Sequence, residues 1–183
     1  LGHGVMAVFS STIYSGRDIQ KISNFKTDAF DQKDFGCLGY MNDDKVMMFS
    51  RTFKKHTLQS VFSEKPITEL PPVGIVYYYA GAKPDILTMM AQNHRGIVII
   101  GSGSGNYSQA WLNEIETLGA QGIIFVRASR VNQGIVYESD VFDPHNVCIP
   151  SNTLSGQKAR VLLMLALSVT QNTKEIKRIF NEY

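Results

Sequence analysis

Gly96-Ile-Val-Ile-Ile-Gly101-Ser-Gly-Ser-Gly-Asn106 is the stretch of sequence that decides the fold. Its first five residues have the continuous apolar character of a strand buried in a parallel sheet, and a helical pattern begins at Ser108. The small residues between them leave backbone N–H groups and short polar side chains at the carboxyl end of the strand, where open α/β folds bind ligands. We therefore predict a site at this loop. A nucleotide phosphate, an amino-acid head group and tight packing alone all remain open as its purpose.

The alternation of strand and helix extends on both sides of this stretch. Apolar runs and helical periodicity predict strands at 73–79, 96–100 and 122–127 and helices at 83–92, 108–118, 157–167 and 173–183. Strands that alternate with helices form parallel sheets through right-handed crossovers, with helices on both faces. We therefore predict that residues 73–183 form a small parallel-sheet α/β domain of the flavodoxin/Rossmann-like kind.

A long stretch at 128–153 follows the third predicted strand and has no regular period. It leaves the carboxyl end of that strand, so it should lie on the same rim of the sheet as the 101–106 loop. Two loops on one rim predict one half of a binding site.

The start of the chain has a different character. Val5-Met-Ala-Val-Phe9 has the pattern of a buried strand, yet only residues 1–4 precede it, so we expect further α and β elements upstream. Residues 35–40 and 45–51 predict a short β excursion around a turn at 42–44.

These patterns divide the chain into three parts. We interpret residues 1–51 as the remnant of a truncated amino-terminal α/β domain. The polar segment 52–72 ends in Leu70-Pro-Pro72 and is typical of an interdomain linker. Residues 73–183 then form the carboxyl-terminal α/β domain.

Composition and charge argue against two kinds of partner. The 183 residues are 44% apolar, which is enough to bury a real core. Their net charge of +2, with no basic stripe, gives no reason to expect nucleic acid or a membrane surface. The longest apolar runs, such as 161–167, are too short to cross a bilayer.

The sequence carries no pattern of metal ligands. His56, His94 and His145 each stand alone, without ligand spacing in the same element. Cys37 and Cys148 lie too far apart for a metal pair and sit among apolar or turn residues, so we expect packed thiols, with a disulfide left open. No metal or other cofactor is predicted.

Six ordered motifs give the chain a specific resemblance, and they span almost all of its length. They are Gly16-Arg-Asp-Ile-Gln-Lys21, Phe35-Gly-Cys-Leu-Gly-Tyr40, Leu70-Pro-Pro-Val-Gly-Ile-Val-Tyr77, Gly101-Ser-Gly-Ser-Gly-Asn106, Val126-Arg-Ala-Ser-Arg-Val131 and Gln157-Lys-Ala-Arg-Val-Leu-Leu163. In this order they resemble the bacterial type II L-asparaginases of the asparaginase/glutaminase family. The resemblance covers the carboxyl-terminal half to two-thirds of the family. The family's Thr-Gly-Gly-Thr-Ile segment and a later Thr-Asp segment, which supply the nucleophilic threonine and its polar partners, lie outside the matched region.

The resemblance implies an L-asparagine amidohydrolase, which converts L-asparagine and water into L-aspartate and ammonia with a threonine nucleophile. L-Glutamine is an expected side substrate, because one methylene group rarely gives strong discrimination. The resemblance implies no cofactor, and it implies a homotetramer built from close dimers. We expect this chain alone to be inactive until the missing amino-terminal half is supplied. Its location, periplasmic or cytoplasmic, stays open.

The resemblance also assigns site residues. Lys21 matches the family's catalytic lysine, which helps to activate the threonine hydroxyl and relays its proton, provided that burial or a neighbouring charge adjusts its proton affinity. Asn106 and Asp140 match residues that reach into the active site of an adjoining subunit and hold the α-amino and α-carboxylate groups of the substrate. The family often has glutamate at the second position, so Glu138 is an alternative to Asp140. Without the resemblance, Asn106 could equally cap the following helix.

The main alternative hypothesis is a non-catalytic, Rossmann-like dinucleotide-binding module. Gly101-x-Gly-x-x-Asn106 resembles a dinucleotide fingerprint that lacks its third glycine, and Arg127 and Arg130 at the end of the next strand could meet a 2′-phosphate. A third hypothesis is a non-catalytic remnant that serves subunit association. Ammonia release in the presence of the upstream half would separate a hydrolase from both.

Overall fold

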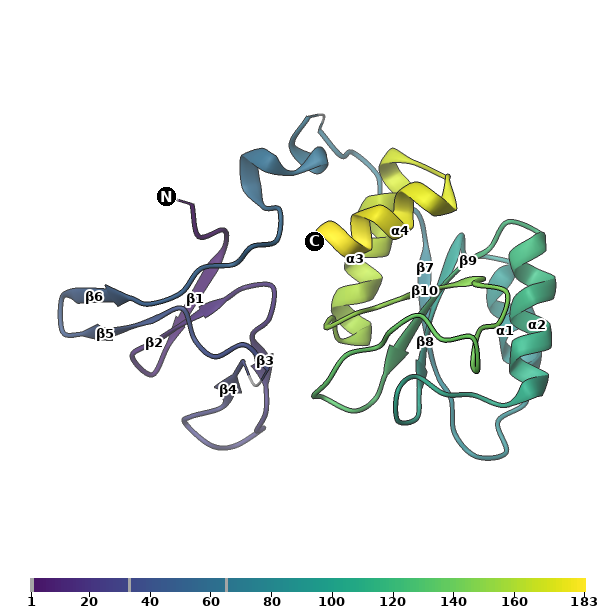
Figure 1. Ribbon diagram of the computed structural model, residues 1–183, viewed down its shortest axis with the longest axis horizontal. Helices are drawn as coiled ribbons and strands as arrows, with labels where there is room; N and C mark the ends of the chain where they lie inside the picture. Colours follow the sequence, from purple (N-terminus) through teal and green to yellow (C-terminus); the bar gives the residue numbers. More distant parts are fainter. Residues whose placement is uncertain (1, 33, 65) are drawn as a thin grey trace. The chain divides into compact units, whose positions relative to one another are not determined.

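The computed structural model describes residues 2–32, 34–64 and 66–183 (Figure 1). The chain divides into two compact units, each described here by itself. Unit 1 comprises Leu1–Glu64 with Tyr183, and unit 2 comprises Lys65–Glu182. No helix in the described ranges has the length and apolar character that a membrane span requires.

Unit 2 is built on a four-stranded parallel sheet with the strand order β10-β9-β8-β7. The strands are β7 (Val73–Tyr77), β8 (Gly96–Gly101), β9 (Ile124–Ser129) and β10 (Cys148–Pro150). In the register, Gly96 is opposite both Val73 and Ile124, and Cys148 is opposite Phe125. Strands that follow one another in sequence are neighbours in the sheet, so the order does not reverse at any point among these four strands.

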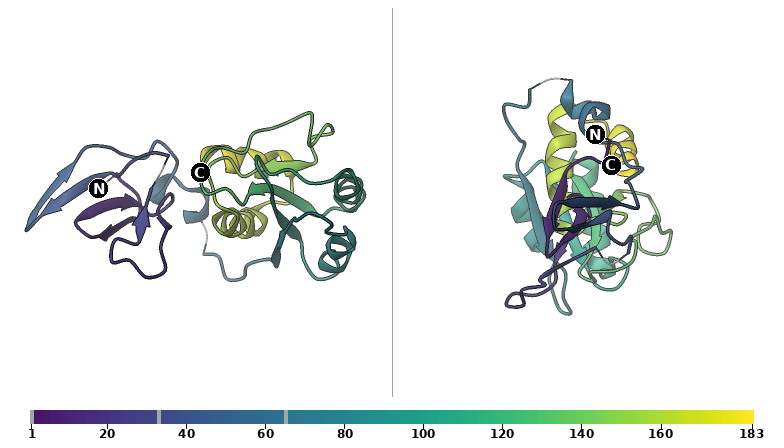
Figure 2. Two further views of the ribbon diagram at one scale, coloured as in Figure 1. Left: turned by 90° about the horizontal axis from the view of Figure 1, so that it is seen from below. Right: turned by 90° about the vertical axis from the view of Figure 1, so that its left-hand side faces the viewer.

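Four helices cover the two faces of this sheet. They are α1 (Asp85–Ala91), α2 (Gln109–Ala120), α3 (Gly156–Val169) and α4 (Thr173–Glu182). Helices α1 and α2 contact each other and cover one face, while α3 contacts β7, β8 and β9 on the other and α4 packs on α3 and β10 (Figures 1 and 2). The predicted parallel α/β sheet with both faces covered is therefore confirmed.

Strand β8 explains why the sheet needs helices on both faces. All six of its residues are buried, and successive side chains point to opposite faces. Ile97 and Ile99 belong to one core cluster with Trp111 of α2, whereas a Cβ on Gly156 of α3 would lie 2.3 Å from Ile100 Cδ1. The close approach of α3 therefore depends on a glycine at its first turn.

Strand β10 lies within the stretch 128–153, for which the sequence predicted no regular structure, so that prediction was wrong at 148–150. The carboxylate of buried Asp143 holds this strand in place, since its two oxygens accept the backbone N–H groups of Val147 at 2.9 Å and Cys148 at 2.8 Å. A strand of three residues is too short to show a period of its own.

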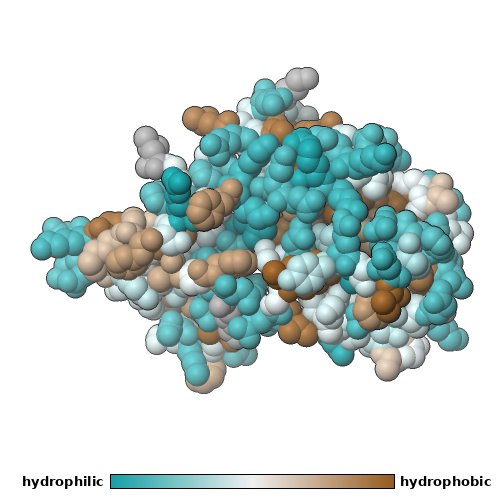
Figure 3. Space-filling model, viewed as in Figure 1, coloured by the Kyte–Doolittle hydropathy of each residue, from teal (hydrophilic) through white to brown (hydrophobic). Residues whose placement is uncertain are grey.

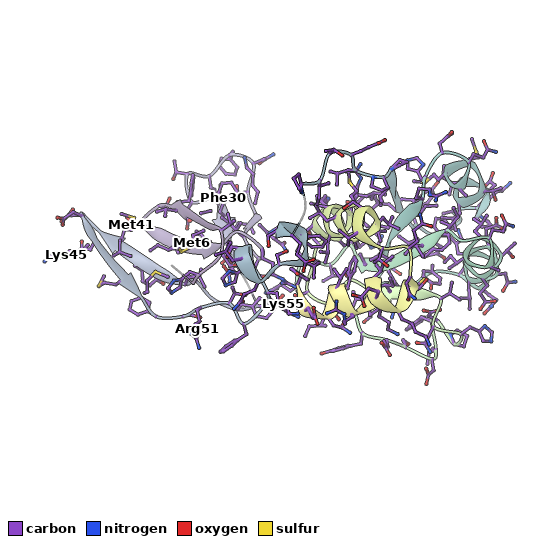
Figure 4. The ribbon with its side chains drawn as sticks, turned by 90° about the horizontal axis from the view of Figure 1, so that it is seen from above. Met6, Phe30, Met41, Lys45, Arg51 and Lys55 are labelled. Carbon is purple, nitrogen blue, oxygen red and sulfur yellow. The ribbon has the colours of Figure 1, made fainter. Side chains whose placement is uncertain are left out.

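Unit 1 contains antiparallel strands and short 3-10 turns. A four-stranded sheet has the order β1-β2-β5-β6, and the pair β3-β4 forms a separate two-stranded sheet. Their bounds, with those of the turns η1 and η2, are β1 (Met6–Phe9), β2 (Thr12–Ser15), β3 (Gln20–Lys21), β4 (Phe30–Asp31), β5 (Gly39–Asn42), β6 (Lys45–Met48), η1 (Thr57–Gln59) and η2 (Val61–Ser63). Strands β5 and β6 form a hairpin around Asp43, whose φ is 54°, so the predicted β excursion around 42–44 is confirmed (Figure 4).

The prediction that Val5–Phe9 is a buried strand was wrong for this structure. Within the described residues, strand β1 is at the edge of the sheet and pairs with β2 alone, antiparallel. Val5 is 74% exposed and Val8 53% exposed. The apolar run is real, but the described residues of this unit leave most of it exposed, because burial depends on the tertiary structure and not on the run itself.

Candidate functional site

The loop after β8 closes into a tight turn that ends at Asn106. The backbone N–H of Asn106 donates to Ser102 O at 2.7 Å, and the N–H of Ser102 donates back to Asn106 O at 3.0 Å. A Cβ on Gly101 would lie only 2.3 Å from the carbonyl carbon of Gly105, and Gly105 itself has a φ of +89°. Both positions therefore require glycine, and the run of small residues is what allows the chain to turn back so sharply.

Asn106 carries an unused hydrogen-bond acceptor. Its Oδ1 atom is buried and has no partner among the described residues. Helix α2 begins at Gln109 with Ser108 as its N-cap, so Asn106 does not cap this helix. A buried acceptor without a partner costs about 1–3 kcal/mol, which makes it a group that an incoming N–H donor would satisfy.

The loop between β9 and β10 carries the candidate acids. Glu138 is exposed, and its Oε1 forms an ion pair with Lys177 Nζ of α4 at 2.7 Å. Asp140 lies exposed in a turn in which the N–H of Asp143 donates to Ser139 O at 2.8 Å. Its carboxylate forms no ion pair with any described residue.

Arg127 of β9 links the two loops. Its Nη1 donates to Ser104 O at 2.7 Å, and its Nη2 donates to Tyr137 O. This role was not predicted from the sequence, in which the available signal was a charged residue at the end of the predicted strand 122–127. Arg127 is 2% exposed, so its guanidinium is engaged with carbonyl oxygens and is not free to meet a 2′-phosphate.

Two further titratable groups, Tyr107 and Cys148, contact each other at β10. Tyr107 Oη lies 3.5 Å from Cys148 Sγ. Burial, with the Asp143 carboxylate nearby, raises the pKa of Cys148 to about 12, and burial likewise raises the pKa of Tyr107 well above its usual range. Cys37 and Cys148 are free thiols; Cys148 is packed in the interior as expected, whereas Cys37 is only partly buried.

Lys21 belongs to unit 1, whereas Asn106 and Asp140 belong to unit 2. Lys21 is exposed on β3, where it pairs with Phe30 of β4, and its Nζ lies 5.9 Å from the centroid of the Phe30 ring. That ring packs on Phe9 at 4.9 Å, and Tyr14 Oη donates to Phe30 O at 3.1 Å. The backbone under Lys21 is thus anchored to the four-stranded sheet, while its side chain reaches solvent. Across the described ranges, no group of three or more His, Cys, Asp or Glu side chains could hold a metal ion.

Two family models match this chain. "Glutaminase/Asparaginase C-terminal domain" matches residues 72–180, and "Asparaginase, N-terminal" matches residues 1–54. The chain therefore belongs to the glutaminase/asparaginase family. Neither the family match nor the sheet supports the dinucleotide-binding hypothesis, because such sites lie where the strand order reverses and this order does not.

Several known proteins are similar over the whole chain. L-asparaginase 2 of Escherichia coli is 36% identical and matches 98% of this chain, which covers 52% of that protein. "Probable L-asparaginase periplasmic" of Haemophilus influenzae is 34% identical over 100% of this chain and 53% of its own length. The crystal structure of a probable cytoplasmic L-asparaginase from Campylobacter jejuni aligns with a TM-score of 0.90 and 35% identity, over 99% of this chain and 60% of that one. The chain thus spans about half the length of the curated relatives it matches.

Proposed function

We propose that this chain is the carboxyl-terminal portion of an L-asparagine amidohydrolase that releases L-aspartate and ammonia. The observation that carries this proposal is the buried, unpartnered Oδ1 of Asn106 on the carboxyl rim of a sheet in a member of this family. An acceptor at that position suits the α-ammonium group of an amino acid, which brings three N–H donors. L-Glutamine is the second substrate that the family description supports.

The chain alone is proposed to be inactive, because the nucleophilic threonine has to come from the family's preceding residues. The surface of unit 1 supports this view. Its described residues bury only a small apolar set and leave many large apolar side chains exposed, some of them on the β5-β6 hairpin (Figure 3). The buried set is Ile13, Tyr14, Ala29 and Leu38. A polypeptide that supplies the rest of the amino-terminal domain would cover such a surface. Ammonia release by a sample whose intact mass matches these 183 residues alone would contradict the proposal.

Lys21 is proposed as the proton-relay residue. With the upstream half supplied, Lys21→Met should abolish ammonia release and leave the circular dichroism spectrum and the melting temperature nearly unchanged, because the exposed Nζ makes no ion pair with a described residue in this chain. Lys26→Met is the matched control, since Lys26 is also an exposed lysine of unit 1. Loss of folding in the Lys21 variant, or full activity in it, would count against the role.

Asn106 and Asp140 are proposed to hold the substrate. Asn106→Ala should raise the KM for L-asparagine and lower kcat/KM. The loss should correspond to about 1–3 kcal/mol of transition-state stabilisation, the cost of leaving one buried hydrogen-bonding group of the substrate without a partner. Asp140→Asn should do the same for substrates that carry a free α-amino group. Asp140 is preferred to Glu138 because the Glu138 carboxylate already pairs with Lys177. Glu138→Gln is the matched control, and a larger loss in it than in Asp140→Asn would transfer the acidic role to Glu138.

The oligomeric state and the cellular location are proposed from membership of the family. We infer a homotetramer of close dimers, which sedimentation of the complemented protein would test, with a stable monomer as the contrary result. The boundaries 1–51, 52–72 and 73–183 likewise stay a proposal for the domain division. The relatives' names include both a periplasmic and a cytoplasmic protein, so both compartments are retained.

A further inference from the structure

Arg127 is a charged side chain in a strand that is otherwise apolar and buried. Residues 124–128 of β9 are all buried, and Arg127 keeps 2% exposure. A buried guanidinium is costly unless its N–H groups are hydrogen bonded or its charge is paired. Among the described residues Arg127 forms no ion pair. Its stabilisation therefore rests on backbone carbonyl groups.

The two carbonyl acceptors of Arg127 come from different loops. Ser104 O belongs to the turn after β8 and lies 2.7 Å from Nη1, while Tyr137 O belongs to the loop between β9 and β10 and accepts from Nη2. Each acceptor lies close in sequence to a candidate substrate-binding residue, because Ser104 precedes Asn106 and Tyr137 precedes Asp140. One side chain thus contacts both halves of the candidate site.

The aliphatic part of the Arg127 side chain also packs against the 102–106 turn. A Cβ on Gly105 would come within 2.9 Å of Arg127 Cγ, so the turn rests on the arginine without a gap. Ser129 Oγ donates to Gly103 O, and the N–H of Arg130 donates to Gly101 O at 3.0 Å, which ties the same turn to β9. Among the groups that make these contacts, only the guanidinium of Arg127 also contacts the loop between β9 and β10.

We propose that Arg127 is a positioning residue that fixes the 102–106 turn against the 136–140 segment, and so sets Asn106 relative to Asp140. The planar guanidinium can donate in two diverging directions at once, whereas a lysine ammonium on a flexible stem has no such fork. The connection of the two loops through Arg127 does not depend on which reaction the protein catalyses. The expected effect of Arg127 on substrate binding rests on the proposed function.

Amide hydrogen exchange of the unaltered 183-residue chain tests the coupling. The reporters are hydrogen-bonded amides, Gly105 and Asn106 in the first loop and Val136 and Asp143 in the second. If one side chain holds both loops, the two pairs of amides should open together and respond alike to low urea concentrations. Independent opening of the two pairs would overturn the proposal, whether or not any variant folds.

Arg127→Lys and Arg127→Gln test the side chain itself. Each should speed exchange at both pairs of amides at least tenfold. Arg130→Lys is the matched control, because Arg130 is an exposed arginine on the same strand end, and it should change exchange less than twofold. Faster exchange at one pair only, or equal effects in the Arg130 control, would overturn the proposal.

A kinetic measurement separates positioning from mere stability. With the upstream half supplied, Arg127→Lys should raise the KM for L-asparagine about tenfold and change kcat much less. The same substitution in an Asn106→Ala, Asp140→Asn background should add little, since both residues that it positions are then altered. An unchanged KM, or a full tenfold effect in that background, would reduce Arg127 to a structural residue. Absence of turnover in the complemented parent would contradict the proposed function and leave the exchange result standing.

Discussion

Asn106 and Arg127 differ in how their buried polar atoms are hydrogen bonded. The guanidinium of Arg127 donates to carbonyl groups of two loops, while the amide oxygen of Asn106 has no donor among the described residues. A buried polar group that is hydrogen bonded makes the structure around it more rigid. A buried acceptor without a donor is a position where a ligand N–H group can form a new hydrogen bond. In the proposals above, Arg127 therefore supports the loops and Asn106 recognises the substrate.

Cys148 gives a prediction for alkaline pH. Burial and the Asp143 carboxylate raise its pKa from 9.0 to about 12, so between these values the folded protein keeps a proton that the unfolded chain has lost. The contribution of this thiol to the free energy of unfolding is therefore fully present below pH 9 and is lost as the pH rises towards 12. In that range the free energy of unfolding should fall by on the order of 1.4 kcal/mol per pH unit.

Urea denaturation at pH 8, 9.5 and 10.5 measures this slope. Cys148→Ala should flatten it, and Cys37→Ala, which removes the partly exposed thiol of unit 1, should not. A Cys148→Ala variant with the parent's full slope would show that another group carries the pH dependence.

At the scale of elements, the sharp turn after β8 depends on glycine for two separate reasons. Gly105 combines a positive φ with close contact to Arg127, whereas Gly134 has a φ of +97° and open space where a Cβ would go. A side chain at Gly134 would meet only the cost of the left-handed backbone, whereas one at Gly105 would meet that cost and a steric clash as well.

Gly105→Ala should therefore destabilise unit 2 more than Gly134→Ala does. We expect about 1–2 kcal/mol for Gly134→Ala from the left-handed backbone alone. For Gly105→Ala we expect a further cost of about 1–3 kcal/mol from overpacking against Arg127. Thermal or urea unfolding of both variants measures the difference, and equal losses would mean that the turn can shift away from β9 without cost.

At the scale of the whole chain, the two units have unequal cores. Unit 2 buries a contiguous cluster that includes Trp111, Ile115 and Phe125 between its sheet and helices. Unit 1 leaves Val5, Val8 and other large apolar side chains exposed. Since stability scales with the apolar area that folding buries, the two units should differ in how often they open.

Limited proteolysis of the 183-residue chain should therefore remove unit 1 first. Brief digestion followed by intact-mass measurement should leave a resistant fragment that begins near the 52–72 segment and retains β7 to α4. Addition of the upstream half should protect unit 1, because the exposed apolar surface would then be covered. Equal resistance of the two units in the chain alone would mean that unit 1 has more cohesion than its buried residues indicate.

The sequence by itself determined the alternation of strands and helices in unit 2, the turn of small residues after β8 and the family. These are local properties, since a period of apolar residues or a run of glycines reports directly on the backbone that carries it. The tertiary structure alone decided that 148–150 form a fourth strand, that Arg127 joins two loops, that the oxygen of Asn106 has no partner and that Val5–Phe9 lie at an exposed edge. Each of these depends on residues far apart in the chain, because hydrogen bonding and burial are set by which atoms meet in space.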